Sequence, residues 1–158
     1  GPAAELGRRR DYWDVISAAY ANRARTFGQL SAFNEAGIQT FMFEAVLDEV
    51  TTDICTAMHG MEFQVQAALD RYKAVADADD PTAVRELQPW VRASKGELWI
   101  PGEGDERVTI ARVERSAIGR QGQAGSYSGM LSAAALERLG VTVPPLHGRC
   151  RSTIIPGQ

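Results

Sequence analysis

The sequence has very few side chains that bind metals or form disulfides: two cysteines and two histidines among 158 residues. This scarcity excludes a disulfide-rich secreted scaffold, because such domains use many cysteines. No run reaches the roughly 18 consecutive apolar residues of a bilayer-spanning helix, and the N-terminus lacks the charged start and apolar stretch of a secretory signal. We therefore expect no association with a membrane.

The chain also has no large excess of charge of either sign. The 17 basic and 20 acidic side chains leave a formal net charge of −3, so the chain has no general basic surface for nucleic acid. Residues 119–126 are rich in glycine but match neither a Walker motif nor a dinucleotide-binding motif. Any contact with nucleic acid would be local, and no small-molecule substrate is evident.

What is present predicts a single α+β domain over residues 3–158, after a Gly1-Pro2 pair that resembles the remnant of a cleaved tag. A long amphipathic helix is expected over residues 5–36, ended by Gly37. Arginines line one side of this helix, at Arg8, Arg9, Arg10, Arg23 and Arg25. Its other side carries apolar and small residues at steps of three and four, namely Trp13, Ile16, Ala19, Tyr20, Ala24, Phe27, Leu30 and Phe33.

Shorter elements follow the long helix. Alternating β-branched and aromatic residues predict a strand over residues 38–47, and two more strands are expected over 97–100 and 107–114. Short helices are expected over residues 54–58, 62–76, 81–87 and 132–139. Residues 143–156 form a rigid turn that leads into a final strand. The strands should make a small mixed or antiparallel sheet.

The four scarce side chains fall into two close pairs, Cys55-x3-His59 and His147-x2-Cys150. A tetrahedral zinc site is commonly built from two such pairs, because each pair brings two ligands at once. The spacing therefore predicts a closed Cys2His2 zinc site with a structural role.

Three alternatives remain open for these residues. The histidines can be ordinary turn residues and the cysteines small buried hydrophobes. Cys55 and Cys150 can instead form a disulfide. A catalytic Cys-His pair would need an orienting carboxylate such as Asp48 or Asp53.

The order of motifs resembles the phage head morphogenesis family, the minor capsid proteins similar to phage Mu protein F. The helix carries Ala-Arg-Thr-Phe-Gly at residues 24–28 and ends in Glu-Ala-Gly at residues 35–37. The middle motif is Leu-Asp-Glu-Val-Thr-Thr-Asp-Ile-Cys-Thr-Ala-Met-His-Gly-Met-Glu-Phe at residues 47–63, and the final motif is Pro-Pro-Leu-His-Gly-Arg-Cys-Arg-Ser-Thr-Ile-Ile-Pro at residues 144–156. Residues 64–143 match only loosely.

The resemblance implies a non-enzymatic head protein that joins a phage or prophage particle. Its partners would be the portal or other capsid proteins, with packaged DNA a further partner of the arginine-lined helix, and it would occur in the virion or in the bacterial cytoplasm during assembly. Thr52 and Ser152 stand where many members have cysteine, which leaves one four-ligand set of Cys55, His59, His147 and Cys150. Arg151 is expected to support this set by pairing with Asp48 or Asp53.

Domains resembling this family also occur in bacterial toxins, which gives a second expectation. The chain would then be a delivery module, or a metal-dependent hydrolase or nuclease. Polar residues in the loosely matched region are candidates for such chemistry, or are simply an exposed strand and loop: Arg112, Glu114, Arg115, Ser126, Tyr127 and Ser128.

Overall fold

The computed structural model describes residues 2–119 and 124–158, apart from the side chains of residues 2–13, 15 and 16. It confirms an α+β fold with a long N-terminal helix. In the described part, no helix has the length and apolar character needed to cross a bilayer. The helices are α1 (Pro2–Glu35), α2 (Asp53–Met58), α3 (Val65–Ala76), α4 (Pro81–Leu87) and α5 (Ala133–Leu139). The strands are β1 (Thr40–Glu44), β2 (Glu62–Gln64), β3 (Arg92–Ser94), β4 (Glu97–Pro101), β5 (Arg107–Arg115), β6 (Ser126–Ser128) and β7 (Thr153–Pro156).

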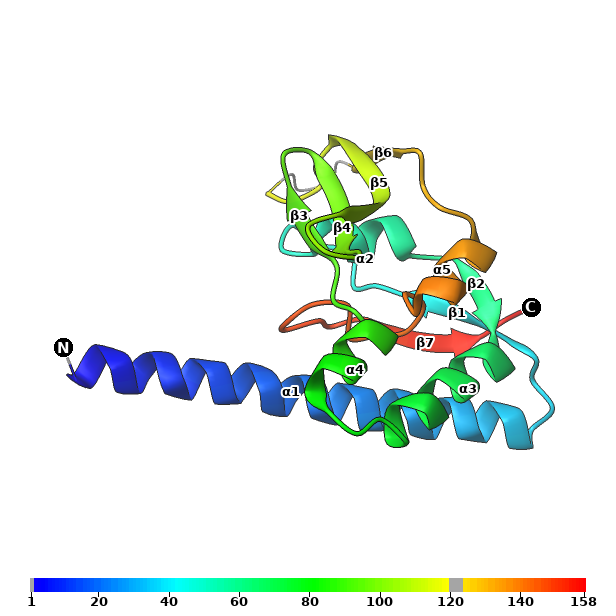
Figure 1. Ribbon diagram of the computed structural model, residues 1–158. Helices are drawn as coiled ribbons and strands as arrows, with labels where there is room; N and C mark the ends of the chain where they lie inside the picture. Colours follow the sequence, from blue (N-terminus) through cyan, green and yellow to red (C-terminus); the bar gives the residue numbers. More distant parts are fainter. Residues whose placement is uncertain (1, 120–123) are drawn as a thin grey trace.

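The strands form two antiparallel sheets in place of the single sheet expected. One has the order β2-β1-β7 and the other β3-β4-β5-β6. Figure 1 shows the first sheet between the long helix α1 and the second sheet, with the N-terminal part of α1 extending beyond the rest of the molecule. The final strand β7 pairs with β1, so the end of the described chain lies beside its first strand.

One connected core joins both sheets and the helices. Strand β1 turns Phe41 and Phe43 inward, and both are fully buried, as the alternating pattern of this strand predicts. Leu30 of α1 and Ile154 of β7 belong to the same core. These contacts fix the position of β7, and therefore of the turn that precedes it.

The buried face of α1 differs from the expectation. Tyr20 is 74% exposed and Phe27 is 44% exposed, whereas Asn22 and Thr26 are buried. Asn22 is buried because its amide donates to a backbone carbonyl of the C-terminal turn, and the Thr26 hydroxyl donates to the Asn22 carbonyl of its own helix. Ala19, Leu30 and the half-buried Phe33 complete the face. The predicted Trp13 and Ile16, and the arginines at 8–10, have side chains outside the described part.

The helix expected over residues 62–76 was placed too early. Residues 62–64 pair with β1 as strand β2, and α3 begins only at Val65. Phe63 alternates inward between two exposed neighbours, and its ring lies 5.7 Å from that of Phe41. Cross-strand aromatic packing therefore outweighs the helical pattern that follows. Strands β3 and β6 were not predicted, and residues 120–123 of the glycine-rich segment lie outside the described residues.

Replacing Phe41 with alanine should lower the free energy of unfolding by about 3–5 kcal/mol, because the change leaves a cavity in the core. Denaturant unfolding measures this loss. Tyr20→Ala is the matched control: its ring is 74% exposed, and its replacement should change stability by less than about 0.5 kcal/mol. Equal midpoints for the Phe41→Ala variant and the unmodified chain would contradict the core described here.

Candidate metal centre

Three of the four predicted ligands meet in the folded chain. Cys55, His147 and Cys150 offer ligand atoms that all lie within 4.8 Å of one another. The Cys55 Sγ atom is 3.3 Å from His147 Nε2 and 3.7 Å from Cys150 Sγ. Two thiols and one imidazole at such distances form a group that could hold a metal ion.

The two cysteines are not joined by a disulfide. Both are free, and their sulfur atoms are 3.7 Å apart, whereas a disulfide bond is about 2.0 Å long. The structure therefore presents them as two thiol ligands, one buried and the other partly buried.

Helix α2 delivers Cys55, and Asp53 holds the beginning of that helix in place. The Asp53 carboxylate accepts hydrogen bonds from the Tyr127 hydroxyl at 2.7 Å, the Ser116 hydroxyl at 2.8 Å and the Ala117 amide at 3.1 Å. Together with burial, the carboxylate raises the pKa of Tyr127. Asp53 thus ties α2 to the segment between β5 and β6.

The C-terminal turn delivers His147 and Cys150, and helix α1 holds this turn through its polar face. The Asn22 amide donates to the Cys150 carbonyl at 3.0 Å, and Arg25 donates to the Ser152 carbonyl at 3.3 Å. Arg149 adopts a left-handed backbone with φ of 61°, which reverses the chain between the two ligands. Nothing in the sequence marked Asn22 for this role, since its partner is a backbone atom 128 residues away.

His147 presents the nitrogen that a metal needs. Its Nδ1 atom lies 2.6 Å from the Gly148 carbonyl, an acceptor, so Nδ1 carries the proton. The other nitrogen, Nε2, then has a free lone pair directed at the Cys55 sulfur and at the Thr52 hydroxyl, which is 3.0 Å away. A backbone carbonyl on the opposite ring nitrogen is a common way to orient a metal-binding histidine.

The two thiols lie close enough to shift each other's pKa. The Cys55 thiol hydrogen-bonds to the Cys150 sulfur, which lowers the pKa of Cys150 and raises that of Cys55, and burial raises the latter further. Burial lowers the pKa of His147, but the hydrogen bond and charge of Cys150 outweigh it and raise that pKa. The lowered pKa of Cys150 favours its thiolate, the form in which cysteine binds metals.

His59 does not join the cluster, which corrects the predicted four-ligand set. The sequence placed it one helical turn after Cys55, but α2 ends at Met58 and His59 adopts an extended ψ of 127°. Its side chain is exposed, and its Nδ1 atom accepts a hydrogen bond from the Ala45 amide at 3.1 Å. Because α2 has only six residues, it ends before His59, and Cys55 and His59 therefore do not share one helix face.

Arg151 pairs with Asp48, one of its two expected partners. Two guanidinium nitrogens donate to the two carboxylate oxygens, at 2.8 and 3.0 Å. This contact, together with hydrogen bonds from Thr51 and the Val50 amide, holds the pKa of Asp48 well below its usual range. The pair ties the turn before α2 to the turn that carries Cys150.

A small cavity of about 160 Å³ opens on the cluster. Cys55 and His147 line it, together with the hydroxyl residues Thr52 and Ser152. In the sequence, Thr52 and Ser152 stand out only as positions where many members of the resembled family have cysteine. In the fold both lie beside the three ligands.

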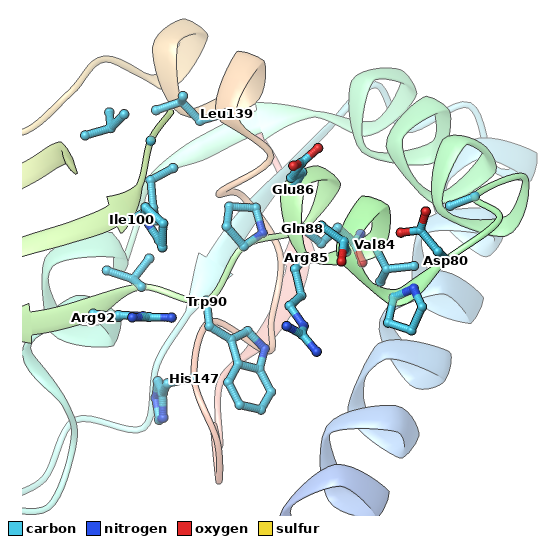
Figure 2. A pocket seen from close by; sticks show the side chains of 18 of the residues that line it. Asp80, Val84, Arg85, Glu86, Gln88, Trp90, Arg92, Ile100, Leu139 and His147 are labelled. Carbon is cyan, nitrogen blue, oxygen red and sulfur yellow. The ribbon is translucent and has the colours of Figure 1, made fainter. Parts of the chain in front are cut away.

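A larger groove also reaches His147. It has a volume of about 1550 Å³ and lies between α1, α4 and the turn between β4 and β5. Figure 2 shows Trp90 and Arg85 beside His147 along this groove. Gln88 lines it, is 8% exposed, and has no hydrogen-bond partner for either amide atom within the described part. Arginines and acids are equal in number on its walls: Arg23, Arg85, Arg92, Arg138, Asp79, Asp80, Glu86 and Glu103.

The polar residues considered for enzymatic chemistry have structural partners. Ser128 donates to Glu114 at 2.6 Å, and Arg115 donates to the Ala124 carbonyl at 3.0 Å. Tyr127 is bound to Asp53, as described above. These residues connect β5 to β6 and do not converge on a cavity together.

Replacing Arg151 with alanine should raise the pKa of the Asp48 carboxyl toward the ordinary value of about 3.9, because the strongest contact that lowers this pKa is removed. A carboxyl-detected NMR titration measures the change. In the unmodified chain, the pair favours the folded state above about pH 4, and this contribution disappears as the pH falls through the lower folded-state pKa. Arg149→Ala removes a neighbouring arginine that makes no such contact and should leave the Asp48 titration unchanged.

Comparisons with known proteins do not assign this chain: no family model matches it, and neither does any curated protein or solved structure.

Proposed function

We propose that this chain is a non-enzymatic structural domain of a phage or prophage head protein, stabilised by a zinc ion bound to Cys55, His147 and Cys150. One observation carries the proposal. The two segments that carry the resemblance, residues 47–63 and 144–156, meet at the three-residue cluster although they are far apart in the sequence. A metal bound where these two motifs meet would explain both of them, because each motif supplies at least one ligand to the same ion.

The distances support zinc. A tetrahedral ion with Zn–S bonds of about 2.3 Å and Zn–N bonds of about 2.0–2.1 Å separates two sulfurs by roughly 3.8 Å and a sulfur from a nitrogen by roughly 3.5 Å. In the cluster, the two sulfurs are 3.7 Å apart and Cys55 Sγ is 3.3 Å from His147 Nε2, while all three ligand atoms lie within 4.8 Å of one another. The ligand set of two thiols and one imidazole is also a borderline-soft set that zinc favours.

Such an ion would act as a cross-link. It would connect α2 to a turn 95 residues later, as measured between the two cysteines. Because the site does not exist in the unfolded chain, the free energy of metal binding would add to the stability of the fold. This is a structural role that requires no substrate.

A metal-dependent hydrolase or nuclease, as in a toxin-associated domain, is the second candidate. The observation in its favour is a three-ligand set beside a cavity, which is the usual arrangement of a catalytic zinc. Hydrolysis would also need a general base near the metal. The carboxylates of Asp48 and Asp53 already accept hydrogen bonds from Arg151 and from Tyr127, so we favour the structural role.

A protein partner fits the described surface better than DNA does. Arg25, one of the arginines expected to meet DNA, is hydrogen-bonded to the C-terminal turn. Tyr20 of α1 is instead 74% exposed and lines the large groove together with the half-buried Trp90. Exposed aromatic side chains beside a groove of balanced charge are typical of protein interfaces. The portal or another capsid protein is the proposed partner.

Purified protein should contain about one zinc ion per chain, and Cys55→Ser, Cys150→Ser and His147→Ala should each remove most of it, because each deletes one ligand. Elemental analysis after gel filtration measures the stoichiometry. His59→Ala is the matched control, since His59 lies outside the cluster and its variant should keep its zinc. A zinc content near zero in the unmodified protein would reject the metal centre.

Co-expression with a portal protein of the same phage or prophage should yield a complex that survives gel filtration. Trp90→Ala and Tyr20→Ala should weaken this complex by about tenfold or more, because large aromatic side chains dominate interface energies. Unchanged melting temperature and zinc content would show that both variants remain folded. Failure to bind any virion component would overturn the head-protein role and leave the metal centre as a separate conclusion.

A further inference from the structure

The metal centre provides only three ligands from the described residues. Besides Cys55, His147 and Cys150, the nearest polar side chain is Thr52, whose hydroxyl is 3.0 Å from the ligating nitrogen of His147. A neutral hydroxyl is not among the usual zinc ligands, which are thiolate, imidazole and carboxylate. Zinc would therefore complete its tetrahedron with a ligand from outside this set.

The carboxylate of Asp48 is not available for this position. Asp48 is on the adjacent turn, but both of its oxygens accept hydrogen bonds from Arg151, and one of them also accepts from Thr51. Moving this carboxylate to the metal would break the pair that joins the two turns. The Asp53 carboxylate is likewise engaged by Tyr127 and Ser116, so another molecule is the natural source of the missing ligand.

An external ligand has a route to the metal. The 160 Å³ cavity reaches Cys55 and His147 and is far larger than the roughly 10–15 Å³ that one water requires. Arg149 and Arg151 line it. Two thiolates already neutralise a divalent ion, so an added anion would be balanced by Arg149, which is exposed and makes no ion pair within the described part.

Apolar residues also line this cavity. Val46 and Val50 line the cavity and are 49% and 66% exposed, and Leu47 between them is 59% exposed. Three neighbouring exposed aliphatic residues beside a charged pocket favour a polypeptide partner over a free small ion, because a polypeptide can cover them while its side chain enters the pocket.

We propose that the fourth coordination position of the metal is completed by an acidic side chain of a partner protein, which enters through the small cavity while its flanking residues cover Val46, Leu47 and Val50. This inference rests on the proposed metal centre. The centre would then be a binding site for a partner, in which a metal–carboxylate bond forms beside the exposed apolar residues Val46, Leu47 and Val50.

The test uses the whole chain loaded with cobalt(II), whose visible absorption reports its ligands. Three probes are added: a pentapeptide with one Glu between Leu and Val residues, the same peptide with Gln, and sodium acetate. The Glu peptide should change the cobalt spectrum in a saturable way, at a concentration about tenfold or more below that needed with acetate. The Gln peptide should cause no change, because it lacks the carboxylate.

Two variants sharpen the result. Thr52→Cys should retain cobalt and lose the response to every probe, because a fourth thiolate occupies the open position; Ser152→Cys serves the same purpose if the first variant does not fold. Val50→Ser should weaken the response to the Glu peptide and leave that to acetate unchanged.

Each outcome decides a separate point. Bound cobalt with no response to any probe would show that the fourth position is closed, and would overturn this inference while the metal centre stands. Equal responses to acetate and the Glu peptide would overturn the partner assignment, because a small carboxylate would then suffice. Failure of the chain to bind cobalt would reject the metal centre itself, and this inference with it.

Discussion

The fold depends on one constraint: the C-terminal turn must meet both α1 and α2, although these three segments are far apart in the sequence. Asn22 and Arg25 bind backbone carbonyls of the turn from one side. Cys55 meets its side chains from the other. The position of β7, which closes the first sheet, follows from the same contacts, since β7 begins directly after the turn. The turn is therefore the point at which helix, sheet and cluster are brought together.

Polar groups hold this junction because it includes backbone that no sheet covers. A turn with buried carbonyls needs donors, and an apolar helix face would have left those carbonyls unpaired at a cost of roughly 1–3 kcal/mol each. This explains why α1 buries Asn22 at the turn, while the buried Thr26 hydroxyl donates to the Asn22 carbonyl within its own helix. The Asp48–Arg151 pair also joins this turn to the turn before α2, through side chains that are both partly exposed.

Much of the architecture could be predicted from the sequence. Strand β1 was found from its alternation, α5 from its serine cap and final glycine, and the α+β class from the order of elements. Three of the four predicted ligands also meet in the fold, because scarce residue types in two close pairs restrict the possible partners strongly. The error at His59 has a different origin: spacing predicts a shared helix face only while the helix continues, and a six-residue helix ends within two turns. The contact of Asn22 could not be predicted, because its partner is a backbone carbonyl that comes close only after folding. The position of Gln88 on the large groove could not be predicted either, because the groove also forms only on folding.

The pairing of β7 with β1 also has a consequence for synthesis on the ribosome. Cys55 leaves the ribosome 95 residues before Cys150, and at about 5–20 residues per second this delay is roughly 5–20 s. During that time β1 has β2 on one side but an unpaired edge on the other, and Cys55 is a thiol without its later neighbours. Edges of this kind invite pairing with other chains. During this interval the nascent chain is exposed to misassembly and to thiol oxidation, and both hazards end when β7 closes the sheet and the turn before it completes the cluster.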